Sequence, residues 1–464
     1  MRLRSAYDEE VPDFPAPSCA NANLTCDFLV VGGGLSGLSA AEAAMQRGLD
    51  VIVIEKGAYG KEAASGLNAG QFLTGWAKPV GTMLSELTQQ EQDMGVSGEL
   101  ARSRAERRVR AFLRRTIEGC LRLAEINHRY NLRASVQQGA VIAALNEADM
   151  GGLEEAYEFM QQSNFRALMP VVGERRPPFF RLLSARQLQK RCGTDERVYA
   201  GGVIDYFGGS FRPRTLLLGL ARALQKKNVR LYQDTSAQAL DFPDNQVTVF
   251  CGNGATIRTS HLFMANAYAR HINGDVRERT IFNYDYVVAV NLPERAKILT
   301  AENVFSDTRD PCFYARRHGD RFYMGFEETA ETSPEITQAV ARRTLDEGKR
   351  IFPALRTLEE RDITNAWSGA VYYTLDDYPF VERRHGGRMI TFAAPSDHGN
   401  ALALRVGEIV GDFVAHAIRR PTSDDAMSRR RMLEQQLRLF EGFPKGMRLR
   451  PGKRYQEAAF EGPL

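Results

Sequence analysis

Residues 26–56 read CDFLVVGGGLSGLSAAEAAMQRGLDVIVIEK, and this stretch decides the fold that the sequence predicts. An apolar run leads into a glycine turn, an alanine-rich helical segment follows, and a second apolar run ends at Glu55. Such uniformly apolar strands are typical of a parallel sheet that is covered on both faces. The stretch therefore predicts a strand–helix–strand unit of the Rossmann type.

The glycine turn carries a GxGxxG motif. With 40 glycines in 464 residues the motif decides little by itself, so its place between a strand and a helix carries the prediction. Glycines let the backbone approach a pyrophosphate at the helix N-terminus, and the acid after the second strand can accept hydrogen bonds from ribose hydroxyls. We expect an adenine dinucleotide here, NAD or FAD, in contact with Gly32, Gly34, Leu35, Ser36, Gly37, Glu55 and Lys56.

Two further segments are candidates for the cofactor site. A second glycine-rich segment, SGLNAGQ at 65–71, would let a flat ring approach closely, which favours FAD over a nicotinamide cofactor. The stretch AAPSDHGNALALRVGEIV at 393–410 starts a helix on a glycine-containing turn, and a helix N-terminus offers free N–H groups and partial positive charge. The candidates are Ser65, Gly66, Asn68, Ala69, Gly70, Gln71, Ser396, Asp397, His398, Gly399 and Asn400.

Composition excludes several other classes of protein. The net charge of +4 and the glutamates among the arginines of 99–133 argue against nucleic-acid binding, and favour the solvated side of an amphipathic helix. No apolar run is long enough to span a membrane. Six scattered cysteines without a CxxC pair predict reduced thiols and no metal site, and the N-terminal residues do not form a secretory signal. We expect a cytoplasmic protein.

Four segments together resemble a known superfamily. The first unit, ASGLNAGQ (64–71), GGSFRPRTLLLGLARAL (208–224), and WSGAVYYTLDDYPFV (367–381) with SDHGNALALRVGEIVGDF (396–413) are similar to FAD-dependent amine oxidases of the glycine oxidase, sarcosine oxidase and D-amino acid oxidase superfamily. Together with FPKGMRLRP (443–451), they most resemble the γ-glutamylputrescine oxidase branch.

The resemblance implies an α/β fold. A Rossmann-like FAD-binding domain with a mixed parallel sheet would be interleaved with an antiparallel-sheet substrate domain. We expect an N-terminal arm (1–24), an FAD-binding domain (25–100, 197–270 and 372–426), a substrate domain (101–196 and 271–371) and a C-terminal helix with a basic arm (427–464). It also implies noncovalent FAD, because the cysteine that tethers the flavin in some members has no counterpart in WSGAVYYTLDD, and it adds Ala237 as a cofactor contact.

The sequence departs from the superfamily's pattern at its catalytic positions. Asp397 replaces the first glycine of the usual small-Gly-His-Gly loop; it would either cap the helix or meet a cationic amine. Tyr323 stands where a lysine activates oxygen in sarcosine-oxidase-like members, and the lysine that holds the substrate carboxylate is also missing. These losses argue against a simple amino acid bound by its carboxylate. The candidate catalytic residues are Tyr323, Glu327, Tyr372, Asp397 and His398.

The resulting expectation is oxidation of a C–N bond in a small-molecule amine. Hydride would pass from the α-carbon to flavin N5, and water would hydrolyse the imine. Reoxidation by oxygen would release hydrogen peroxide; another acceptor would make the protein a dehydrogenase or a tailoring enzyme of the same fold. A noncatalytic FAD-binding accessory subunit is the alternative from another class. The sequence predicts no oligomeric state.

Overall fold

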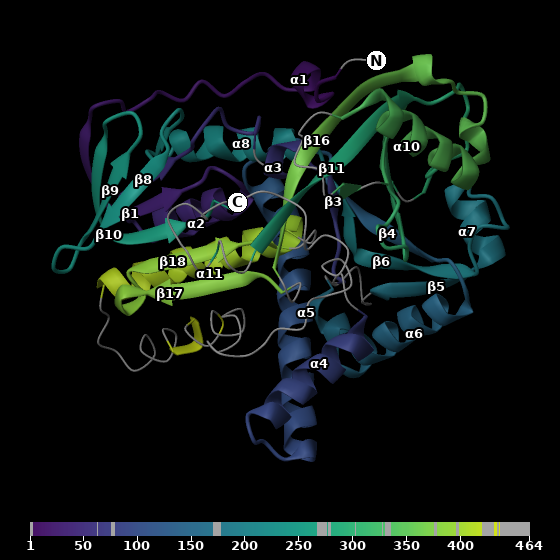
Figure 1. Cartoon of the computed structure of the whole chain (residues 1–464), viewed down its shortest axis with the longest axis horizontal. Helices are drawn as coiled ribbons and strands as arrows, with labels where there is room; N and C mark the ends of the chain where they lie inside the picture. The colour runs from purple at the N-terminus through teal and green to yellow at the C-terminus, as the bar shows by residue number, and fades with distance from the viewer. Residues whose placement is uncertain are drawn as a thin grey trace.

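The computed structural model describes residues 3–62, 64–75, 79–169, 178–266, 276, 280–301, 303–326, 328–329, 336–374, 378–395, 399–419, 431–433 and 436. Two β-sheets lie side by side, and the longest helices run between and below them (Figure 1). Within the described residues, the helices are too short or too polar for any of them to cross a lipid bilayer.

The first sheet contains the predicted strand–helix–strand unit. Its strands are, in spatial order, β17 (Phe380–Arg384), β18 (Met389–Ala393), β10 (Thr256–Met264), β1 (Asn23–Val31), β2 (Val51–Ile54) and β7 (Arg230–Tyr232), with β9 (Val247–Cys251) beside β10 and β8 (Ala237–Asp241) beside β9. The strands from β18 to β7 are parallel, and β17, β9 and β8 add antiparallel edges. All four residues of β2 are buried, as expected for a sheet covered on both faces.

The second sheet is mostly antiparallel. Its strands are, in spatial order, β15 (Glu328–Thr329), β11 (Thr280–Asn291), β14 (Arg321–Gly325), β13 (Tyr314–His318), β12 (Val304–Asp307), β4 (Gln137–Ala144), β6 (Gly201–Ser210) and β3 (Gln71–Phe72), with β16 (Ile363–Thr374) beside β11 and β5 (Phe180–Ser184) beside β6. The pair β4–β12 is parallel. The mixed α/β architecture predicted from the sequence is confirmed.

The two faces of the second sheet have different neighbours. On the outer face, Val288 and Met324 pack against Val340 and Leu345 of α10. The inner face, which we define by Tyr323 and Trp367, packs against the N-terminal segment and Ala69. The helices are α1 (Tyr7–Glu10), α2 (Leu35–Gln46), α3 (Ala64–Leu67), α4 (Val80–Asp93), α5 (Gly98–Arg129), α6 (Glu147–Gln162), α7 (Ala185–Cys192), α8 (Pro213–Gln225), α10 (Gln338–Ile351) and α11 (Gly399–Arg419).

Helices α2 and α11 lie unusually close together. A Cβ atom at Gly407 would lie 2.2 Å from the carbonyl oxygen of Ser36, and one at Gly411 would lie 2.4 Å from that of Ala40. Ser39 Oγ donates a hydrogen bond to the carbonyl oxygen of Leu404 (2.7 Å). These two glycines therefore let the middle of α11 lie against the first half of α2.

The sheets do not follow the predicted domain boundaries throughout. Strand β6 was expected in the FAD-binding domain (197–270), yet it pairs with β4 and β5 in the second sheet. Helix α5 was expected in the substrate domain (101–196), yet its apolar side shares one core with α2 and α11. Strand pairing and helix docking over long sequence distances leave no local signal, so the domain boundaries themselves stay a prediction.

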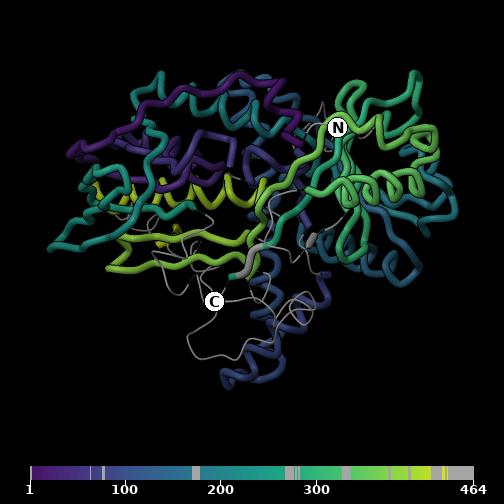
Figure 2. Tube along the Cα trace, turned by 45° about the horizontal axis from the view of Figure 1, so that its top comes forward, coloured from purple at the N-terminus to yellow at the C-terminus, as the bar shows by residue number. Residues whose placement is uncertain are grey.

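The N-terminal segment 3–16 is an ordered strap across the molecule. Figure 2 shows it in purple, running from the second sheet, near β16, toward the first sheet. Arg214 of α8 pairs with Asp8 and with Asp13 (2.7 Å), and Arg212 pairs with Glu10 (3.2 Å). Acidic residues of the strap thus bind basic residues at the junction between the sheets.

Candidate functional site

The glycine turn between β1 and α2 is built without room for side chains. Gly32 has a φ of +113°, and a Cβ atom there would lie 2.9 Å from the backbone of Ala265. A Cβ atom at Gly37 would lie 2.0 Å from the carbonyl oxygen of Gly32. Helix α2 then begins at Leu35, with Gly34 as an N-cap that makes no side-chain hydrogen bond. The first N–H groups of α2 therefore receive no side-chain acceptor from the N-cap residue and can bind an acceptor from elsewhere.

Glu55 lies against this turn, as the motif predicts. Its Oε2 accepts a hydrogen bond from the N–H of Gly33 (2.7 Å), and Oε1 accepts one from the N–H of Lys56 (2.9 Å). Burial is the main cause that raises the pKa of this carboxyl group. Ala237 begins β8 close by, two residues after Thr235, whose N–H donates to the carbonyl oxygen of Glu55 (2.9 Å).

The second glycine-rich segment contacts the first. Ser65 Oγ accepts a hydrogen bond from the N–H of Leu35 (3.1 Å), which supplies a cap to α2 from outside the helix. A Cβ atom at Gly66 would lie 2.2 Å from the carbonyl oxygen of Gly60, so this segment also requires a glycine for close packing. Asn68 Oδ1 accepts from the N–H of Gly70 (2.8 Å) and fixes the turn that follows.

The third predicted segment meets the second at Asn400. Its Nδ2 donates to the carbonyl oxygen of Gln71 (2.6 Å) and to Oδ1 of Asn68 (3.1 Å). Gly399 is the first residue of α11. Ser396, Asp397 and His398 lie outside the described residues, so their predicted roles remain predictions.

The residues brought together fit an adenine dinucleotide. The turn excludes side chains, the start of α2 lacks a side-chain cap within its own helix, and an acid follows β2. These are the features by which a backbone binds a pyrophosphate and a carboxylate binds a ribose. The predicted cofactor-site residues that the structure places around this turn and the two segments beside it are Gly32, Gly34, Leu35, Ser36, Gly37, Glu55, Ser65, Gly66, Asn68, Ala69, Gly70, Gln71, Gly399 and Asn400. Lys56 follows Glu55 and is exposed.

Tyr323 lies in an aromatic cluster on the inner face of the second sheet. Its side chain is fully buried, and its hydroxyl donates to Glu10 Oε1 of the strap (2.7 Å). The rings of Tyr7 and Trp367 lie 5.9 and 6.2 Å from its ring, centroid to centroid. Burial is the main cause that raises the pKa of this phenol.

Arg316 and Tyr7 belong to the same cluster and were missed by the sequence reasoning. Arg316 pairs in register with Tyr323 across β13 and β14, and its guanidinium lies 4.3 Å from the centroid of the Tyr323 ring. The sequence ARRH gives one signal for Arg316, because alternation along a strand sends one of two adjacent arginines to each face. No pattern near Tyr7 indicated contact with residues more than 300 positions away.

Tyr372 lies on the other face of the sheet. The register of β16 with β11 is regular from Thr374 to Asn365, so Trp367 and Tyr373 share the inner face. Tyr372 shares the outer face with Ala366 and Ser368. The structure therefore does not bring Tyr372 together with Tyr323. Glu327 lies outside the described residues.

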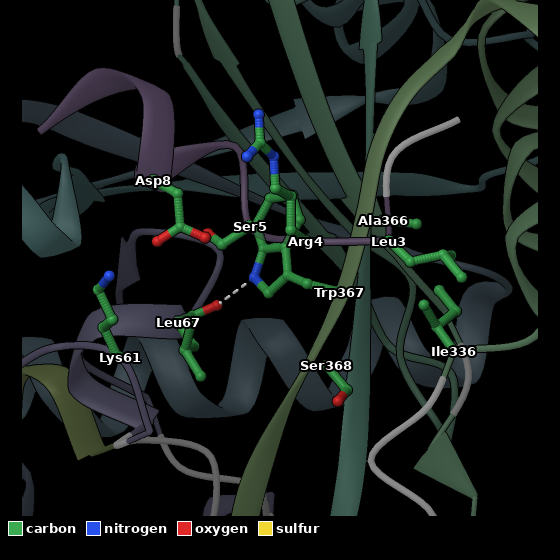
Figure 3. A pocket seen from close by; sticks show the side chains of 10 residues that line it. All are labelled: Leu3, Arg4, Ser5, Asp8, Lys61, Leu67, Ile336, Ala366, Trp367 and Ser368. Atoms are coloured by element: carbon green, nitrogen blue, oxygen red, sulfur yellow. Dashed lines mark hydrogen bonds between the residues drawn. The ribbon is translucent and has the colours of Figure 1, made fainter. Parts of the chain in front are cut away.

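A pocket of about 490 Å³ opens beside the second glycine-rich segment. Two of the residues that line it, Trp367 and Leu67, are joined by a hydrogen bond from Nε1 to the carbonyl oxygen (2.7 Å), which the dashed line in Figure 3 marks. Charged groups of Arg4, Asp8 and Lys61 stand around the pocket (Figure 3). Each of these charges already has a partner in Glu9, Arg214 and Asp13, respectively. Among the described residues, each charged group that lines the pocket is therefore already part of an ion pair.

An aspartate–tyrosine pair lies on the inner face near residues 65–71, which we call the cofactor segment because the sequence predicts FAD there. Asp285 of β11 pairs in register with Gly369, and a Cβ atom at Gly369 would lie 3.5 Å from Cβ of Leu67. Tyr314 donates its hydroxyl hydrogen to Oδ2 of Asp285 (2.6 Å). The sequence reasoning did not single out this carboxylate, because its neighbours on the inner face come from three separate strands.

Comparisons with known proteins agree with the geometry. The family model described as DAO, FAD dependent oxidoreductase, matches residues 27–413. The probable oxidoreductase OrdL of Rhizobium meliloti is 25% identical over 454 residues, 96% of this chain and 94% of its own. The gamma-glutamylputrescine oxidoreductase of Escherichia coli is 27% identical over 213 residues, 46% of this chain and 42% of its own. The crystal structure of glycine oxidase from Geobacillus kaustophilus superimposes with a TM-score of 0.63 at 18% identity, covering 86% of this chain and 96% of that one.

Proposed function

Because this chain belongs to the DAO family of FAD-dependent oxidoreductases, with FAD as its cofactor, we propose that it oxidises a C–N bond of a cationic small-molecule amine. The observation that carries the proposal is the Asp285–Tyr314 pair on the inner face, close to Leu67 of the cofactor segment. A carboxylate in a partly buried site attracts an ammonium group, and hydrogen bonds to charged groups are the stronger ones.

The chain's own residues would position the reactants. FAD supplies the acceptor for the two electrons of the oxidation. Asp285 would bind the ammonium group, and the Tyr314 hydroxyl would keep the carboxylate turned toward the inner face. The substrate must lose a proton from nitrogen before hydride leaves the α-carbon, because only a neutral amine has the lone pair that forms the imine. The water-excluding cluster around Tyr323 would line the site beside it.

A γ-glutamylated polyamine is the finer substrate proposal. It rests on the resemblance of the sequence segments and on the relative in Escherichia coli, which is named a gamma-glutamylputrescine oxidoreductase. Such a substrate carries an ammonium group at the free end of its polyamine chain, and Asp285 would bind that group.

The test is bleaching of the flavin absorbance of the purified protein without oxygen. We expect γ-glutamylputrescine or a free polyamine to bleach it faster than D- or L-amino acids. Asp285→Asn should raise the half-saturating amine concentration roughly tenfold or more, because a charge-assisted hydrogen bond is lost. Asp320→Asn, at an exposed position after β13, is the matched control and should leave that concentration unchanged.

Oxidation without oxygen is a second candidate. Tyr323 stands where the sequence resemblance places an oxygen-activating lysine, and the strap residues Tyr7 and Glu10 cover it. Readmitting air after bleaching separates the two: rapid peroxide release indicates an oxidase, and slow reoxidation indicates another acceptor. A flavoprotein that none of these compounds bleaches would contradict amine oxidation and favour a tailoring enzyme or an accessory subunit.

A further inference from the structure

Arg316 is a buried cation without a counter-ion among the described residues. Its side chain is 2% exposed. Nη1 donates to the carbonyl oxygen of Phe211 (3.0 Å) and Nη2 donates to the hydroxyl oxygen of Tyr7 (3.0 Å). Nε meets no acceptor, and in the described part of the chain no carboxylate oxygen lies within the 4.0 Å ion-pair distance. A buried charge in this state is unfavourable unless some other anion balances it.

The nearby carboxylate of Glu10 already forms ion pairs with other arginines. Glu10 receives Arg212 (3.2 Å) and Arg321 (3.4 Å), as well as the Tyr323 hydroxyl. The ring of Tyr323, 4.3 Å from the Arg316 guanidinium, compensates only part of its lost hydration, because a cation–π contact is weaker than an ion pair in the same place. The cluster therefore retains an excess of positive charge at Arg316.

The pKa shift of a neighbouring histidine is consistent with an excess of positive charge at Arg316. His318, two residues along the same strand, has a lowered pKa, first because it is buried and then because of the charges of Arg316 and Arg212. Tyr7 and Tyr323 have raised pKa values, chiefly through burial, so neither supplies a phenolate at neutral pH. Among the described residues, the titratable groups around Arg316 thus leave its charge unbalanced.

Arg316 also lies beside the second glycine-rich segment (65–71) and is linked to it through neighbouring residues. Gly70 has a φ of +82°, and a Cβ atom there would lie 3.0 Å from Nε of Arg316 and 3.1 Å from its Cζ. Tyr7, which accepts from Arg316, donates its own hydroxyl hydrogen to the carbonyl oxygen of Asn68 (3.0 Å). Gln71 Nε2 donates to the carbonyl oxygen of Ala315, the residue before Arg316 (3.1 Å). Nε, which has no acceptor among the described residues, therefore lies beside the glycine-rich backbone that is predicted to bind FAD.

We propose that Arg316 is the counter-charge for FAD in its reduced, anionic state, acting across residues 68–70 as a positioned positive charge that raises the midpoint potential. Electrostatic stabilisation of this kind is effective where water is excluded and the charge is already in place. The inference rests on FAD as cofactor and is independent of the proposed amine substrate, because it concerns a property of the holoenzyme without substrate.

The test is the midpoint potential of the holoenzyme, measured anaerobically by equilibration with reference dyes and without substrate. Arg316→Met keeps much of the side-chain volume and removes the charge. We expect it to favour the oxidised state at least tenfold, which corresponds to a potential lower by about 30 mV or more for two electrons. Arg316→Lys keeps a cation and should change the ratio less than threefold.

The matched control is Arg321→Met. Arg321 lies on the adjacent strand β14, and its charge is paired with Glu10 and Glu9 (3.8 Å). It should leave the potential within about 10 mV, or twofold, of the wild type. A purely structural role for Arg316 would lower thermal stability and leave the potential unmoved.

The pH dependence of the potential gives a second readout. Below the N1–H pKa of free reduced FAD in the same buffer, the wild type should keep a slope of about 30 mV per pH unit, one proton for two electrons. Arg316→Met should approach about 60 mV, because the reduced cofactor then takes a second proton. An unchanged potential and slope in the Met variant would overturn the inference. If that variant does not fold, a tenfold or larger shift in the Lys variant, or a comparable shift in Arg321→Met, would overturn it as well.

Discussion

Gly37 lies in the first turn of α2, where its Cα faces the carbonyl oxygen of Gly32. A methyl group would lie 2.0 Å from that oxygen and 3.1 Å from Cγ1 of Val30, and the facing atoms are backbone and a buried strand residue. Neither can move without opening the turn between β1 and α2. A glycine is required here because there is no room for a Cβ atom. Its backbone conformation is helical and would not by itself require a glycine.

Gly37→Ala should therefore abolish FAD binding or reduce it strongly. Forcing extra volume into a close contact typically costs about 1–3 kcal/mol, here at the turn itself, so the FAD dissociation constant should rise roughly tenfold to a hundredfold. Titration of the apoprotein with FAD, followed by flavin fluorescence, measures it. Gly151→Ala, in α6 with no atom within 4 Å of the added carbon, is the matched control and should bind FAD normally. Equal affinities in both variants would contradict the tight-turn explanation.

Single residues were predictable where a motif states a backbone requirement. Gly32, Gly37 and Glu55 lie where the motif places them, because short-range geometry dictates their types. Tyr372 lies on the outer face, since adjacent aromatic residues in a strand point in opposite directions and the sequence alone does not say which faces the site. The sequence did not indicate Arg316, because its lack of a counter-ion among the described residues depends on which carboxylates pair with the neighbouring arginines in the fold.

Helices α2 and α5 are joined by one buried acidic residue. Glu42 is fully buried in the otherwise small and apolar α2. It binds Arg122 and Arg129 (2.7 Å) of α5 and accepts the hydroxyl of Tyr130 (2.8 Å). This carboxylate neutralises two arginines at the helix interface, one of which is itself buried.

Glu42→Ala should destabilise the fold by about 3–5 kcal/mol, because it leaves Arg122 buried without its main partner. Denaturant unfolding of the holoprotein measures the change. Glu99→Ala, at an exposed position in the first turn of α5, should leave the midpoint of unfolding almost unchanged. The double variant Glu42→Ala/Arg122→Met should recover part of the loss, and no recovery would argue against an ionic origin.

The sequence predicted individual helices and strands better than it predicted which of them pack or pair with one another. The strand–helix–strand unit and the long amphipathic α5 are confirmed, since each follows from local periodicity. The glutamates of α5 pair with its arginines, as in Arg102–Glu106 and Arg114–Glu118, which supports a solvated face. The pairing of β6 with β4, which lies about 60 residues away along the chain, leaves no local signal in the sequence.

The strap connects the parts of the whole molecule. Tyr7 is 1% exposed, contacts Trp367 of the second sheet (5.3 Å between ring centroids) and binds Asn68 of the cofactor segment. The sequence predicted an irregular arm for residues 1–24, because proline and small polar residues give no periodic signal. Its burial depends on a cavity formed by distant strands, which a local pattern does not reveal.

Tyr7→Ala should lower the stability of the fold, because it removes the contacts of the strap with Trp367 and Asn68. Loss of a buried aromatic side chain costs about 3–5 kcal/mol, and we expect a lower melting temperature together with weaker FAD binding. Thermal unfolding with and without added FAD separates the two effects. Leu3→Ala, in the same strap with a side chain 65% exposed, should behave like the wild type. A Tyr7 variant that loses stability but binds FAD normally would show that the strap does not support the cofactor segment.

The strap also has a consequence for the order in which the protein is made. Tyr7 leaves the ribosome 309 residues before Arg316, and Glu10 leaves it 313 residues before Tyr323. At about 5–20 residues per second, the strap waits roughly 15–60 s for the strands that bury it. During that interval its acidic and aromatic groups are open to proteases and chaperones. The strap is thus synthesised well before the strands that protect it, and its docking requires β13, β14 and β16 to be in place.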